Sequence, residues 1–175
     1  LMMMSCSILF GQNGVEITVN SRVELENALN GDHGWYPQIK LGQSFGVSKR
    51  VDVKAGVTAT LDLNGYTLSA DNKTYVLNNL GNLTIKDSST EGTGTIEGRG
   101  IYNGSHGSVD DTDLAAVLTI ESGIFKNTGT NGGAAIYNLG TAYINGGTFY
   151  GEYAAIHNRL AVMHIKNVYI IGKTI

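Results

Sequence analysis

The feature that most constrains this chain is a short alternating triplet that recurs along it. Its five copies read LDL, LTI, LTI, AYI and MHI and begin at residues 61, 83, 118, 142 and 163, at intervals of 22, 35, 24 and 21 residues. An apolar residue at every second position predicts a β-strand with one buried face. A repeat of this length predicts that the whole chain is built from stacked copies of one unit.

Two further strand signals follow the triplets, the first after all five and the second after the first four. The first reads YTL, TIE, IFK, TFY and VYI, at residues 66–68, 95–97, 124–126, 148–150 and 168–170. The second reads VLNN, IYN, AIYN and AIHN, at residues 76–79, 101–103, 135–138 and 155–158. Strands this short are stable only when stacked, about 4.8 Å apart, on equivalent strands of neighbouring coils. The chain is therefore expected to be an all-β, parallel β-helix (β-solenoid) of about five coils over residues 56–175.

The same alternation predicts which side chains face the core. We expect one continuous buried column of apolar side chains: Ile96, Ile120, Phe125, Ile136, Phe149 and Ile156. The outward positions are Thr119, Tyr137, Tyr143 and His157. Glycine tolerates positive φ at sharp corners, and Gly123, Gly147 and Gly151 are expected to supply that conformation.

Composition agrees with a β-solenoid and excludes several other classes. Only 15% of the residues are charged and 24 are glycine, which disfavours a bundle of charged amphipathic helices, whereas 42% hydrophobic residues disfavour disorder. One cysteine excludes an internal disulfide framework and every multi-cysteine zinc site. A net charge of −3 argues against broad nucleic-acid binding, which requires a basic footprint.

Residues 15–55 are expected to form an N-terminal cap over the first coil, with a short helix and the first strands. Ser21 and Glu24 have the spacing of a helix-capping box, and Asn30 followed by Gly31 ends the helix. The apolar face of this short helix would consist of Val23, Leu25, Ala28 and Leu29. Solenoid ends need such a cover because a terminal repeat has no neighbour on one side.

Two segments fall outside the repeat. Residues 1–14 begin with a largely apolar stretch of ten residues, too short for a membrane span and without a basic leader region, so we expect a segment that docks on another protein or packs beneath the domain. The MMSC stretch at residues 3–6 resembles a lipoprotein cleavage site, which leaves lipidation of Cys6 open. Residues 104–113 are polar and predict a protruding loop.

One corner of each coil carries an asparagine: Asn79, Asn103, Asn138 and Asn158. Stacked asparagines form hydrogen-bonded ladders between layers, so we expect a structural ladder here, with a ligand site as the alternative.

Outward aromatic side chains are the candidates for carbohydrate binding. Tyr102, Tyr137 and His157 should stack on one exterior face, with Tyr150 and Tyr153 around the adjoining corner. Tyrosine rings suit contacts with sugars or proteins. The alternative is a stacking ladder that only stabilises neighbouring coils.

Several stretches carry a family resemblance: LDLNGYTLS, LGNLTIKDSS, GTGTIEGRGIYNG, LTIESGIFKNTG, GGAAIYNLGTAYINGGTFYG and AAIHN. They resemble the right-handed, pectin-lyase-like β-helices of bacterial surface proteins and bacteriophage fibres. ITVNSRVELENAL is similar to the capping element of that superfamily. The resemblance covers residues 15–175 and implies a right-handed coil. It leaves function open, because this scaffold carries lyases, hydrolases, adhesins and virion parts.

The catalytic motifs of that superfamily are incomplete. GTGTIEGRG resembles a stretch near the start of polygalacturonases, whose later NTD, DD, GHG and RIK motifs supply the chemistry. This chain has NTG, SHG and HIK at residues 127–129, 105–107 and 164–166, in the wrong order along the coils. Its only adjacent acidic pair, Asp110 and Asp111, lies in the polar insertion, where a rigid carboxylate spacing of about 5–9.5 Å is hard to hold. We therefore assign no catalytic residue.

No metal or cofactor site is expected. The four histidines, at positions 33, 106, 157 and 164, lack ligand spacing on a common strand. Asp110, Asp111 and Asp113 lack the glycine and glutamate of an EF-hand loop.

The expected function is that of a non-catalytic structural or attachment β-helix. It would belong to a phage particle, as a head or tail fibre or a decoration, or to a bacterial cell surface, and would thus be extracellular with a glycan as candidate ligand. The alternative is a polysaccharide lyase or glycoside hydrolase of the same fold. Residues 168–175 leave an apolar, unpaired strand edge, so we expect further chain or a neighbouring subunit to cover it. Self-association as a homo-oligomer or larger assembly would use this last coil and the N-terminal segment.

Overall fold

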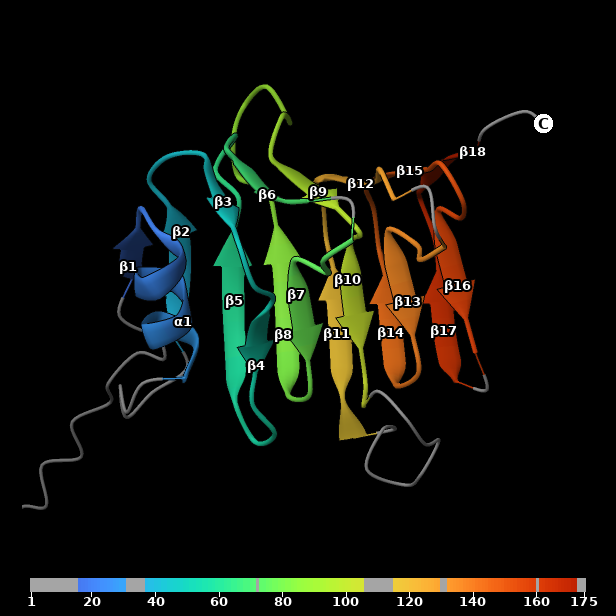
Figure 1. Ribbon diagram of the computed structural model, residues 1–175, viewed down its shortest axis with the longest axis horizontal. Coiled ribbons are helices and arrows are strands. Elements are labelled where there is room, and N and C mark those ends of the chain that lie inside the picture. Colours follow the sequence, from blue (N-terminus) through green and yellow to red (C-terminus); the bar gives the residue numbers. More distant parts are fainter. Residues whose placement is uncertain are drawn as a thin grey trace, which may run out of the picture.

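The chain folds as a parallel β-solenoid of about six turns, one more than the repeats predict. A computed structural model describes residues 16–30, 37–71, 73–105, 115–129, 132–159 and 161–172. The strands lie side by side along the long axis, with the N-terminal helix at one end (Figure 1). Each complete turn visits three sheets in the same order, and every strand pair is parallel.

The first sheet has seven strands: β1 (Glu16–Val19), β2 (Gln38–Leu41), β5 (Thr58–Asp62), β8 (Asn82–Lys86), β11 (Val117–Ile120), β14 (Thr141–Ile144) and β17 (Val162–Ile165). The second has six: β3 (Phe45–Val47), β6 (Thr67–Ala70), β9 (Thr95–Gly98), β12 (Ile124–Asn127), β15 (Thr148–Gly151) and β18 (Tyr169–Gly172). The third has five: β4 (Val51–Val53), β7 (Leu77–Asn79), β10 (Ile101–Asn103), β13 (Ile136–Asn138) and β16 (Ile156–Asn158).

The register of the first sheet corrects one predicted alignment. Leu83 pairs with Ala59, not with Leu61, so the first interval is 24 residues rather than 22. The later triplets pair as predicted, for example Leu118 with Leu83 and Ala142 with Met163. Because side chains alternate with a period of two, a two-residue slip leaves the same residues facing inward, and the sequence pattern cannot detect it.

The core lies between the three sheets and forms one apolar cluster. Phe125 and Phe149 are fully buried, and their rings stack with centroids 5.0 Å apart. The expectation of a single column is wrong, because each sheet contributes its own: Ile96 lies with the two phenylalanines, Ile120 on the first sheet and Ile136 on the third. Ile156 is only partly buried. The outward positions are half-buried or exposed as expected, with Tyr143 at 41%.

Corner glycines serve two purposes. Gly123 and Gly147 adopt φ values of 119° and 107°, as predicted. Gly151 was expected to do the same, and this is wrong, since its φ is not positive. Close approach explains it instead: a Cβ atom at Gly151 would lie 2.1 Å from the carbonyl carbon of Ala154.

Helix α1 (Arg22–Asn30) begins with a modified capping box. The Glu24 amide donates to Ser21 Oγ at 3.3 Å, as the spacing predicts. Glu24 Oε2 accepts from the Asn20 amide at 2.8 Å, one residue earlier than in the standard box. Leu25, Ala28 and Leu29 are buried, whereas Val23 is 61% exposed, so its expected place on the apolar face is wrong. Two positions before Leu25, Val23 lies on the opposite side of a 3.6-residue helix.

The helix covers the N-terminal end of the solenoid. It follows β1 and packs against β1 to β4, in the place that second-sheet and third-sheet strands would otherwise take (Figure 1). The Asn30 side chain completes the cover: Nδ2 donates to the Asp52 carbonyl at 2.6 Å, and the Lys54 amide donates to Oδ1 at 3.0 Å. The Asn30 side-chain amide thus forms hydrogen bonds with the backbone edge of β4 in place of a neighbouring strand.

Several expectations lie outside the described residues. These are the docking segment at residues 1–14 with Cys6, the insertion beyond Ser105 with its acidic pair, His33 and His106. Within the described part of the chain, no helix has the length and apolar character needed to cross a bilayer.

Candidate functional surface

The asparagine corner is a continuous ladder. Asn79 Nδ2 donates to Asn103 Oδ1, Asn103 Nδ2 to Asn138 Oδ1, and Asn138 Nδ2 to Asn158 Oδ1, each at 2.7 Å. Each of these donors also reaches a strand carbonyl, such as that of Val117 at 2.9 Å. The three inner asparagines have 0% exposure. Their amides are thus occupied within the protein, which fits the ladder and leaves nothing for a ligand.

Three of the five aromatic candidates come together on the outer face of the third sheet. Tyr102 and Tyr137 stack with ring centroids 5.0 Å apart and planes at 6°, and His157 follows at 4.5 Å. The rings therefore face one another along the solenoid axis. Tyr102 is also only 6% exposed, so a sugar cannot stack on its ring face without opening the column.

The other two candidates lie elsewhere. Tyr150 is on the outer face of β15 in the second sheet, in register with Lys126. Tyr153 stands in the turn before β16 and is 68% exposed. The structure thus divides the five residues between a stacked column and a separate, more open corner.

Two residues that extend the aromatic column, Tyr75 and Arg99, were not predicted from the sequence. Tyr75 meets Tyr102 edge-on, with ring centroids 5.1 Å apart, and the Arg99 guanidinium lies 5.0 Å from the centre of the Tyr75 ring. Burial raises the pKa of the Tyr75 phenol, and the Arg99 charge acts against that rise. Both residues lie just before third-sheet strands. Their position just before the repeated IYN-type signal indicates that they lie beside the third sheet. Turn residues do not follow the two-residue alternation of strands, so the sequence does not predict the direction of their side chains.

A second aromatic pair lies on the first sheet. Tyr143 and His164 stack with ring centroids 5.1 Å apart and planes at 6°. His164 and His157 therefore project from different sheets, so the described histidines do not share a metal site. No group of three or more metal-ligating side chains occurs in the described residues.

The Asp87 carboxylate has a structural role. Asp87 accepts from the amides of Gly94 at 2.7 Å, Gly65 at 2.8 Å and Ser89 at 3.2 Å, and from Ser89 Oγ at 2.9 Å. Burial raises the pKa of Asp87, but these hydrogen bonds outweigh it and hold the pKa below its ordinary value of 3.8. A general acid for glycoside cleavage needs the opposite, a raised pKa.

Asp62 sits at the same corner one coil earlier and is 7% exposed. Its Oδ1 accepts from the amides of Asn64 at 2.9 Å and Ser88 at 3.0 Å. Both aspartates therefore hold the corner after the first sheet in shape.

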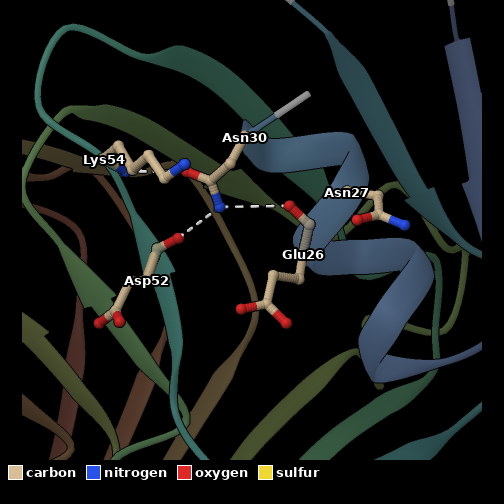
Figure 2. A pocket seen from close by; sticks show the side chains of 5 residues that line it. All are labelled: Glu26, Asn27, Asn30, Asp52 and Lys54. Carbon is tan, nitrogen blue, oxygen red and sulfur yellow. Dashed lines mark hydrogen bonds between the residues drawn. The ribbon is translucent and has the colours of Figure 1, made fainter. Parts of the chain in front are cut away.

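A shallow hollow lies between α1 and β4, lined by Glu26, Asn27, Asn30, Asp52 and Lys54. Figure 2 shows the Asn30 amide between the backbone carbonyls of Glu26 and Asp52. The two acids are paired with arginines, Glu26 with Arg22 and Asp52 with Arg50, both at 2.9 Å. The hollow thus belongs to the packing of the cap.

Comparison of the chain with family models, with curated proteins and with solved structures gave no match. The fold defines the class of protein, a parallel β-solenoid.

Proposed function

We propose that this chain is a non-catalytic structural and attachment module. In this proposal it is a pectin-lyase-like β-helix displayed on a phage particle, as a head or tail fibre or a decoration, or on a bacterial cell surface. It acts outside the cell and holds the particle or cell to a glycan-bearing partner.

The observation that carries the proposal is the unbroken polar and aromatic bonding between coils. The asparagine ladder runs through four coils and the Tyr102–Tyr137–His157 column through three. Such inter-coil bonds stiffen a rod along its axis, a property that suits a projecting support.

Three carboxylates on the coils weigh against the alternative of a polysaccharide-degrading enzyme. Asp87 and Asp62 are committed to backbone amides, and Glu97 faces Lys126 at 3.9 Å. Cleavage of a glycosidic bond in either the retaining or the inverting manner requires two carboxyl groups free to reach it.

Self-association through the last coil is part of the proposal. Tyr169, Ile170 and Ile171 are 74%, 54% and 45% exposed, and Val162 and Ile165 are each 46% exposed. Among the described residues nothing covers this apolar patch and strand edge, so either further chain or a neighbouring subunit is expected to cover it, and self-association is the second of these two cases.

Two measurements test the proposal. The folded chain is incubated with bacterial cell walls and with soluble acidic and neutral polysaccharides, with heat-unfolded chain as control. We expect co-sedimentation with the cell walls, competition of that binding by a soluble polysaccharide, and no new reducing or unsaturated ends. Turnover by the folded chain alone would establish the enzyme instead.

Self-association is measured by sedimentation velocity over a range of concentrations. We expect Ile170→Lys to shift the chain towards monomer and Val23→Lys, at a similarly exposed position on α1, to change nothing. A wild-type chain that stays monomeric at every concentration would remove self-association from the proposal.

A further inference from the structure

The last described coil, residues 153–172, exposes side chains at positions that belong to the core. Ile165 and Ile170 are 46% and 54% exposed, whereas Ile144 and Phe149, which are in register with them one coil earlier, are fully buried. At the opposite end of the solenoid, α1 already covers the first full coil. A second copy that presents its own last described coil would bury both exposed patches in a single two-fold contact.

The formal charges of this coil have one sign. Residues 153–172 contain Arg159 and Lys166, both exposed, and no aspartate or glutamate. A contact between two copies of the coil therefore brings positive charges towards positive charges, and their repulsion opposes the burial of the apolar patches. Any further positive charge on the coil weakens such a contact.

His157 and His164 can supply that further charge. They lie on the outward faces of β16 and β17, where His157 packs on the Tyr137 ring at 4.5 Å and His164 stacks on the Tyr143 ring at 5.1 Å. Each ring pair joins residues in register on adjacent coils, so both pairs run along the solenoid axis. The second side of each imidazole is therefore turned towards whatever covers this coil.

The surroundings of the two histidines are mainly cationic. The next outward positions on their own strands are Arg159 and Lys166, and the strands packed against them, β13 and β14, contain no charged residue. The closest acids in the coil order are Glu121, which accepts from Asn145 Nδ2 at 2.9 Å, and Glu152, which follows β15. Protonation of both histidines raises the formal charge of residues 153–172 from +2, for one arginine and one lysine, to +4.

We propose that two copies pair through their last described coils as a closed two-fold dimer, and that His157 and His164 weaken this contact as the pH falls. The inference rests on the proposed self-association, and names its partner and its regulation. Separate chains take up protons more readily than the dimer, in which each added charge meets the like charges of the partner. By linkage, association is strongest above the range of about pH 8 to 5 in which histidine titrates, and weakens as the pH falls through it.

The test is sedimentation velocity of the full chain over a series of concentrations at about pH 7.5 and about pH 5.5, a range in which ordinary histidines titrate and ordinary carboxyl groups stay charged. We expect a dimer and no larger species at the higher pH. The dissociation constant should be at least about tenfold larger at the lower pH, because like charges then face one another across the contact. Added salt should reduce this difference by screening the charges.

A matched pair of double variants assigns the effect. His157→Gln with His164→Gln keeps a neutral planar amide at both positions and should dimerise equally at the two pH values. His33→Gln with His106→Gln removes the same number of histidines from other parts of the sequence and should keep the pH dependence. Circular dichroism at both pH values checks that every variant is folded.

The possible failures are distinct. A dimer whose dissociation constant is the same at both pH values, or a His157→Gln, His164→Gln variant as pH-sensitive as wild type, overturns the inference but leaves self-association intact. Association that strengthens at the lower pH, or that grows into larger species, would show that unlike ends meet, because β1 and α1 carry Glu16, Glu24 and Glu26. A chain that is monomeric at every concentration and both pH values removes self-association itself, and the inference with it.

Discussion

The first and the last described coils bury their inner residues to different extents. At the N-terminal end, α1 covers the first full coil, and Leu25 and Leu29 are 0% and 1% exposed. In the last described coil, Ile165 and Ile170 are 46% and 54% exposed, although they are in register with the fully buried Ile144 and Phe149. The inner face of a coil is therefore buried by its neighbour and not by the coil itself, as expected for a fold in which each repeat contacts only the next.

The largest difference in stability is expected between substitutions at Phe149 and Ile170, which are in register on the second sheet. Phe149→Ala should lower the free energy of unfolding by about 3–5 kcal/mol, because it leaves a cavity between two coils. Ile170→Ala in the neighbouring coil should cost less than about 1 kcal/mol, since the side chain is already half in solvent. Urea denaturation of both variants measures the difference. Equal losses would mean that the inner face is wrongly assigned.

The asparagine ladder gives the next contrast. Asn103→Ala removes the acceptor of Asn79 and the donor to Asn138 in a fully buried corner, and should destabilise the chain by about 2 kcal/mol. Asn158→Ala removes an exposed final rung and should cost less than about 1 kcal/mol. The free energies come from the same urea titrations. An Asn103→Ala variant as stable as wild type would contradict a structural role for the ladder.

The cap provides a smaller effect. Asn30→Ala leaves the carbonyl of Asp52 and the amide of Lys54 without their partner and should cost about 1–2 kcal/mol. Val23→Ala on the exposed face of the same helix should change stability by less than about 0.5 kcal/mol. Thermal unfolding measures the loss of stability in both variants. A larger loss for Val23→Ala than for Asn30→Ala would contradict the role assigned to Asn30.

The smallest effect is in pH dependence. The pKa of Asp87 in the folded chain is below its ordinary value of 3.8, so its carboxylate stabilises the fold above about pH 3.8, and this contribution is lost as the pH falls through the lowered pKa. Asp87→Asn should lack this contribution, so its stability should approach that of wild type at the acidic end. Unfolding midpoints between pH 2 and 7 measure this, and parallel curves would contradict the assigned role.

Sequence periodicity predicted the parts of the molecule that repeat. The strands, the asparagine corner and the outward aromatic positions follow from alternation and turn residues, because each coil imposes the same environment on equivalent positions. Positions without a repeated environment were harder to predict from the sequence. The slip of Leu61 is invisible to a two-residue period, and the contact between Arg99 and Tyr75 depends on how two turns approach one another in adjacent coils.

Amide hydrogen exchange tests most directly whether each coil is stabilised by its neighbours. It is measured on the 175-residue chain at low concentration and resolved strand by strand within the second sheet. We expect β12 and β15, which have a coil on each side, to exchange at least about 100-fold more slowly than β18, which among the described strands pairs only with β15. Protection of β18 should rise with concentration if the last coil pairs with another chain. Protection of β18 equal to that of β12 in the dilute monomer would contradict the claim that each coil is stabilised by its neighbours.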